Sequence, residues 1–218
     1  AFSRDGSQIV IAGVGGARSY DRQTGRLLRK FEDESKTTIA VGYAPASTMI
    51  LLGNSDYTVS LWNAGNGGKV ADYNGHTPIF TAVEFSGNET FVTGNDTGLV
   101  QIWNYENHSI RSSLDVHTQS ITDIDISADG SKIVTASEDQ TAVLWDAHTG
   151  KAIRVFMGHQ GVVQSAHFLN DAQIITGSSD GTIIIWNVAS AKPVRTFNFN
   201  SGAILSMDVA GNGTVMVS

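Results

Sequence analysis

The chain has 218 residues, which is enough for one large domain or two small ones with an ample hydrophobic core. Its apolar fraction of 41% and charged fraction of 16% are typical of a globular protein and exclude a disordered tail. The net charge of −7, without any basic run, argues against nucleic acid as the main partner, and the lack of cysteine excludes disulfides and thiolate chemistry.

Short runs rich in β-branched and aromatic residues follow one another along the chain, separated by turn residues. The first unit contains the glycine-rich hairpin GVGGA, and the second begins after the acidic loop FEDESKT. Four runs then recur in each of the next three units: FTAVEF, TFVTG, LVQIWN, SIRSSL; ITDIDI, SKIVTAS, TAVLWD, KAIRVF; and VVQSAHF, AQIITGS, TIIIWN, PVRTF. Since no apolar stripe holds a 3.6-residue period, the sequence predicts an all-β protein.

These runs repeat with a period of about 41 residues. The tryptophans lie at positions 62, 103, 145 and 186, and the histidines at positions 76, 117 and 159 keep the same spacing. Tyr20 continues the tryptophan series toward the beginning of the chain. A four-stranded sheet with two apolar faces cannot bury itself, so a radial arrangement of such sheets, a β-propeller, is expected.

Each repeat ends its third strand with a similar motif: LWDAHTG at 144–150 has a Trp-Asp dipeptide, and IWN at 102–104 and 185–187, LWN at 61–63 and SYD at 19–21 are near variants. These motifs resemble those of the WD-repeat (β-transducin-like) family. The resemblance implies one propeller over residues 1–218, with about five four-stranded blades, repeats ending near 21, 63, 104, 146 and 187, and partial blades at both ends. We expect a piece of a larger, seven-bladed propeller; the alternative is five blades that close with overlapping ends.

The resemblance also implies a hydrogen-bonded chain inside each blade, from a histidine through a Ser/Thr and a turn Asp to the tryptophan. An acid–base pair for catalysis is the alternative, but an enzyme needs one site rather than regularly spaced copies, so we expect no catalytic residue and no enzymatic activity. In two units the network is complete, and in a third it lacks the Asp, where Thr97 stands. Its members are His117, Thr135, Asp139 and Trp145; His159, Thr176, Asp180 and Trp186; and His76, Thr93 and Trp103.

The second unit departs further, because Leu52 replaces the Thr and the histidine is missing. With Tyr20 in place of a tryptophan in the first unit, weaker blades are expected on that side.

A second series lies just before the last apolar residue of each innermost strand, at Gly42, Glu84, Asp125, His167 and Asp208. Its regular spacing places these residues at one height around the central channel. They could hold a cation or the tip of a basic peptide. The alternative, which we favour, is a water-filled polar channel, and we expect neither a metal nor a cofactor.

WD-repeat proteins usually present loops to other proteins, so the resemblance implies a non-enzymatic interaction scaffold within a multi-subunit complex. The competing hypothesis is an enzyme or ligand binder acting at the channel. Because the chain is acidic, basic peptides or subunits are the expected partners. No apolar run approaches a membrane helix and no signal peptide opens the chain, so we expect an intracellular protein, cytoplasmic or nuclear. The candidate contact residues are Ser55, Glu138, Ser179 and the acidic loop Glu32, Asp33 and Glu34.

Overall fold

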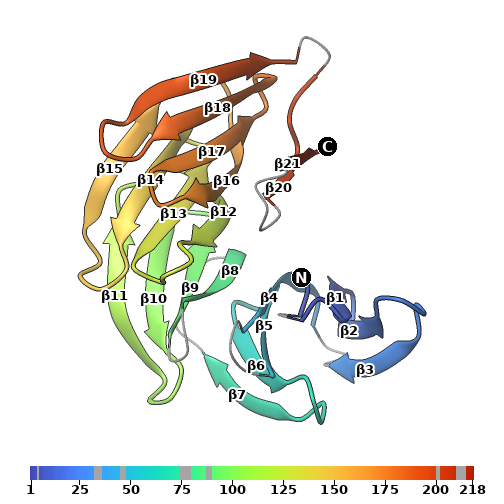
Figure 1. The fold of residues 1–218 in the computed structure, drawn as a ribbon. Coiled ribbons are helices and arrows are strands. Elements are labelled where there is room, and N and C mark those ends of the chain that lie inside the picture. The colour runs from blue at the N-terminus through green and yellow to red at the C-terminus, as the bar shows by residue number, and fades with distance from the viewer. Residues whose placement is uncertain are drawn as a thin grey trace. The chain divides into compact units, whose positions relative to one another are not determined.

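A computed structural model of the chain shows only β-strands as regular structure in the part that it describes (Figure 1). The described residues are 1–3, 5–31, 36–44, 48–73, 80–86, 90–199, 202–209 and 215–218. They form two compact units, one of residues 1–95 and 103–111 and the other of residues 96–102 and 112–218.

The strands pair in antiparallel sheets whose order follows the chain. The first described sheet has three strands, β1 (Gln8–Gly13), β2 (Gly16–Asp21) and β3 (Leu27–Phe31). The next has four: β4 (Thr38–Tyr43), β5 (Met49–Asn54), β6 (Val59–Asn63) and β7 (Lys69–Tyr73). The third sheet contains β8 (Phe80–Ser86), β9 (Thr90–Asn95), β10 (Leu99–Asn104) and β11 (Ser109–Asp115).

Two more four-stranded sheets and a short pair complete the described chain. The fourth sheet has β12 (Ile121–Ile126), β13 (Lys132–Ser137), β14 (Thr141–Asp146) and β15 (Ala152–Met157). The fifth has β16 (Val163–Asn170), β17 (Gln173–Ser178), β18 (Thr182–Asn187) and β19 (Lys192–Asn198). The last is β20 (Met207–Val209) with β21 (Val215–Val217). The prediction of an all-β chain with four strands per unit is therefore confirmed.

Burial within a sheet follows the position of the strand. The two middle strands, such as β13 and β14, are buried along nearly their whole length, which explains their continuous apolar runs. The fourth strand is an exposed edge, and β19 has a single half-buried residue among exposed ones. Each unit therefore has its apolar core between the faces of its sheets.

The core of the second compact unit lies between the fourth and fifth sheets of the chain. Leu144 and Phe156 of the fourth sheet pack with Val163 and Trp186 of the fifth, and all four are almost fully buried. Burial of one such side chain stabilises the fold by about 1.5–3 kcal/mol. These contacts hold the two sheets face to face and position the polar groups described below.

Candidate functional site

A chain of four polar side chains runs through the fourth sheet. His117 precedes β12, Thr135 lies on β13, Asp139 in the following turn and Trp145 on β14. His117 Nδ1 lies 2.8 Å from Asp139 Oδ2, and His117 Nε2 lies 2.7 Å from Thr135 Oγ1. The Trp145 indole N–H donates to the same Thr135 oxygen at 2.9 Å. The structure thus brings together all four residues of the network that the family resemblance implied for this sheet.

One assignment of protons satisfies every member of this network. Nδ1–H of His117 donates to Asp139, the Thr135 hydroxyl donates to Nε2, and the Thr135 oxygen accepts from the indole. Burial lowers the pKa of His117, outweighing the pull of Asp139, and so favours the neutral imidazole. Burial opposes ionisation of Asp139, but hydrogen bonds from Thr141 and His117 hold its pKa below the ordinary value. Each polar group of this network therefore has a hydrogen-bond partner.

The fifth sheet carries a second copy of the network. His159 Nδ1 lies 3.2 Å from Asp180 Oδ2 and Nε2 lies 2.7 Å from Thr176 Oγ1, while Trp186 donates to Thr176 at 2.8 Å. Burial opposes ionisation of Asp180, but hydrogen bonds, first from Thr182, lower its pKa to about 2. In the third sheet Trp103 donates to Thr93 at 2.9 Å, and His76 lies outside the described residues.

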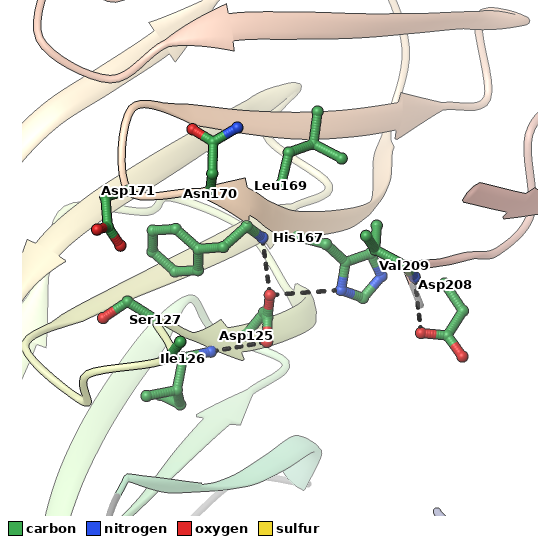
Figure 2. Close-up of a pocket in the computed structure, with 11 residues that line it drawn as sticks. Asp125, Ile126, Ser127, His167, Leu169, Asn170, Asp171, Asp208 and Val209 are labelled. Atoms are coloured by element: carbon green, nitrogen blue, oxygen red, sulfur yellow. Dashed lines mark hydrogen bonds and ion pairs between the residues drawn. The ribbon is translucent and has the colours of Figure 1, made fainter. Parts of the chain in front are cut away.

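A pocket of about 320 Å³ lies in the second unit, at the ends of β12 and β16 and beside β20 (Figure 2). Three residues of the predicted channel series, Asp125, His167 and Asp208, line it. Glu84 and Gly42 belong to the other compact unit, where the Glu84 carboxylate accepts the Phe85 N–H at 3.1 Å.

His167 is the centre of the polar groups at this pocket. Its Nε2 lies 2.8 Å from the Met207 carbonyl oxygen and 3.5 Å from Asp123 Oδ2, and its Nδ1 lies 3.7 Å from Asp125 Oδ2. Burial opposes its charge, but the contact with Asp125 and the negative charges of Asp123 and Asp125 raise the pKa of His167 to about 9. Burial raises the pKa of Asp123 to about 6.

The two aspartates also bind the backbone of the next sheet. Asp123 accepts the Ala166 N–H at 3.1 Å, and Asp125 accepts the Phe168 N–H at 2.8 Å. Asp123 was missing from the predicted channel series, although its spacing of two residues from Asp125 places both carboxylates on one face of β12. Within the described ranges no three His, Cys, Asp or Glu side chains converge to hold a metal ion.

Comparison with known families agrees with this repeated geometry. The family described as "WD domain, G-beta repeat" matches residues 67–104, 108–146 and 150–187, which together are more than half of the chain. The chain belongs to the WD-repeat family. Its sheets are accordingly blades of a β-propeller, with partial blades in the described residues at either end.

Three curated relatives show how far the WD-repeat similarity extends. Mitochondrial division protein 1 of Candida glabrata is 31% identical over 50% of this chain and 17% of its own length. Apoptotic protease-activating factor 1 of Danio rerio is 27% identical over 74% of this chain and 12% of its own length. The human F-box-like/WD repeat-containing protein TBL1X is 28% identical over 66% of this chain and 27% of its own length. The chain therefore spans less than a third of the length of each of these relatives.

The second WD-repeat blade departs from the hydrogen-bonded pattern. Leu52 occupies the Thr position, and the buried Trp62 Nε1 has no hydrogen-bond partner among the described residues. Lys36 Nζ instead forms a 2.8 Å ion pair with Asp56, the turn aspartate of this blade. Sequence reasoning missed Lys36, although it lies 20 residues before Asp56, close to the histidine-to-aspartate spacing of the complete blades.

The predicted protein-binding residues share one structural position. The backbone N–H groups of Ser55, Glu138 and Ser179 donate to loop carbonyls at 2.8–2.9 Å. The side chains of Ser55 and Glu138 are exposed, and that of Ser179 is half-buried. Glu32, Asp33 and Glu34 lie outside the described residues. Within the described part of the chain, no helix has the length and apolar character needed to cross a membrane.

Proposed function

We propose that this WD-repeat chain is a non-enzymatic scaffold that presents its loop surfaces to partner proteins within a multi-subunit complex. The observation that carries the proposal is the repeated closure of the polar network, in which His117 and His159 are each held by an aspartate and a threonine. Buried groups whose hydrogen bonds are all made stabilise a blade and leave no reactive group for catalysis. A rice relative, 32% identical over 47% of this chain, is named a small ribosomal subunit protein, which is a part of an assembly.

The contact surface that we propose includes the residues before each turn aspartate. Their backbones are fixed by hydrogen bonds, so the exposed side chains of Ser55 and Glu138 are presented at defined positions. Ser179 occupies the same position in the fifth blade. The exposed carboxylate of Glu138 and the net charge of −7 favour a basic partner peptide or subunit.

Affinity purification with quantitative mass spectrometry tests this function. The wild type is compared with a Glu138→Lys/Ser179→Arg variant, and Glu106→Lys, which reverses an exposed charge in the turn after β10, is the control. We expect the double variant to lose the most enriched partners and the control to keep them. An unchanged set of partners for the double variant would refute the proposed surface, and no enriched partner for the wild type would refute the scaffold.

A second candidate function is the capture of a basic side chain by the pocket at His167. Its support is the set of three carboxylates, Asp125, Asp171 and Asp208, that line the pocket together with that histidine. Titration with N-acetyl-lysine amide, followed by calorimetry, tests it against an Asp208→Asn variant. Binding that the variant abolishes supports the second candidate, and no heat from the wild type excludes it.

A further inference from the structure

Positive charge gathers on the outer edge strands of the second unit, although the whole chain is acidic. β15 and the turn before it carry Lys151 and Arg154, while β19 carries Lys192 and Arg195. All four side chains are exposed, and residues 151–157 and 190–198 contain no Asp or Glu. We call these four residues the basic band. None of them forms an ion pair with another described residue.

The guanidinium group of Arg154 is held in a fixed position by backbone carbonyl oxygens and not by a carboxylate. Its Nε and Nη2 donate to the Ala189 carbonyl oxygen at 3.3 and 3.2 Å, and its Nη1 donates to the Ile153 carbonyl oxygen at 2.8 Å. A guanidinium has five N–H donors, so two are left for a ligand. Because Ala189 lies in the turn before β19, this contact joins β15 of one blade to the turn that precedes the edge strand of the next.

Arg195 is fixed in a different way. Its guanidinium carbon lies 4.6 Å from the centre of the Phe197 ring, in a cation–π contact. Both arginines of the basic band are therefore pre-oriented, which reduces the entropy that binding a carboxylate would cost.

The surface beside Arg195 combines apolar and basic character. Val194 is 54% exposed and lies between the band residues Lys192 and Arg195. Arginine beside an exposed apolar side chain is a composition typical of protein interfaces. Pro193 has no N–H to donate, so addition of a partner strand along this edge is disfavoured. A partner would therefore contact the side chains of the band.

The first unit repeats the same arginine geometry independently. Arg29 on β3 donates through Nη1 to the Leu28 carbonyl oxygen at 2.8 Å and through Nη2 to the Gly65 carbonyl oxygen at 3.2 Å. Gly65 lies in the turn before β7, as Ala189 lies in the turn before β19. The fixed, charged guanidinium is thus a feature of the outer strands in both compact units.

From these observations we propose that the basic band is a docking surface for an acidic, Asp- and Glu-rich segment of a partner protein. The proposal rests on the scaffold function and adds a second surface, of opposite charge to the loop surface around Glu138. Protection of an edge strand against aggregation is the simplest other role of these charges, but either sign of charge would provide it. The sign of the charge is therefore the property to test.

The test is fluorescence anisotropy with a labelled deca-glutamate peptide and the whole chain, at low and at physiological salt. Lys192→Glu/Arg195→Glu is the test variant, and Arg22→Glu/Lys132→Glu is the control with the same change in net charge. We expect the test variant to weaken binding by about tenfold and the control to leave it within about twofold. Binding should weaken as salt rises. Thermal unfolding of both variants checks that they fold like the wild type.

Three results overturn the proposal: no binding of the peptide to the wild type, equal losses in the test and control variants, or displacement of the peptide by low-millimolar inorganic phosphate. The last result would assign the band to phosphate groups instead of carboxylates. Affinity purification through the loop surface does not depend on these residues. If the peptide does not bind but the purification still recovers partner proteins, the basic band is refuted and the scaffold function stands. If the purification of the wild type recovers no partner, the scaffold function is refuted.

Discussion

Replacing Thr135 by valine removes the hydroxyl group at the centre of the fourth-blade network while keeping the shape of the side chain. Thr135 is fully buried, and its oxygen contacts both His117 Nε2 at 2.7 Å and Trp145 Nε1 at 2.9 Å. The valine variant loses both hydrogen bonds at once. It also leaves a buried indole donor and a buried imidazole acceptor without partners.

The expected loss of stability follows from these two contacts. Each orphaned buried group costs about 1–3 kcal/mol, and the added buried methyl group returns about 0.8 kcal/mol. With two orphaned groups, we therefore expect Thr135→Val to lower the free energy of unfolding by about 1–5 kcal/mol. The effect is large compared with the few tenths of a kcal/mol typical of surface changes.

Urea denaturation at pH 7, followed by tryptophan fluorescence and by circular dichroism, measures this loss if the two signals change together. Thr196→Val, at an exposed position of β19, is the matched control and should lie within about 0.5 kcal/mol of the wild type. A double-mutant cycle with Trp145→Phe should show coupling between the two positions. The reasoning is refuted if Thr135→Val costs no more than the control, or if the two substitutions are additive.

Three further outcomes are expected from the same measurement. Trp145→Phe should cost about 1–3 kcal/mol more than Trp62→Phe, since the Trp62 N–H has no described partner and its removal relieves an unsatisfied donor; equal costs would contradict this. Folding raises the pKa of His167 from 6.5 to about 9, so the stability that this residue contributes should be complete below pH 6.5 and disappear as the pH rises through 9. His167→Gln should abolish this decline, and an identical decline in the variant would exclude His167 as its source. Gly98→Ala should cost more than Gly130→Ala: both have positive φ, worth about 1–2 kcal/mol of strain, but only at Gly98 would the new Cβ lie 2.7 Å from a backbone oxygen, that of His117. Equal effects of the two glycine substitutions would show that this contact relaxes freely.

The strands and the complete networks could be predicted because both follow the chain's own period. The run ITDIDI became β12 with the same bounds, and TAVLWD became β14. The repeat also indicated which distant side chains meet, since His117 lies 22 residues before Asp139 and His159 lies 21 residues before Asp180. The family resemblance implied the network, and the repeat spacing showed which residues of this chain belong to each copy.

Residues that do not repeat could not be found in this way. Lys36 takes over the contact to the turn aspartate with a different residue type, so a search for histidines passes over it. Asp123 acquires its role from the backbone of the next blade, and sequence period does not reveal which N–H groups an edge strand leaves unpaired. The orientation of Arg154 depends on the Ala189 carbonyl, a group that every residue possesses and no sequence pattern marks.

The hydrogen bonds described above between successive blades share a direction. Arg154 donates to the Ala189 carbonyl, His167 binds the Met207 carbonyl, and Asp125 accepts the Phe168 N–H. In each case the side chain belongs to the earlier blade and the backbone group to the later one. During synthesis on the ribosome, a finished blade therefore displays the side chains that the next segment needs before that segment emerges. The blades can therefore assemble in order from the N-terminal side. Each blade supplies the side chains of these contacts, and the next blade supplies only backbone N–H and C=O groups, which do not depend on its sequence.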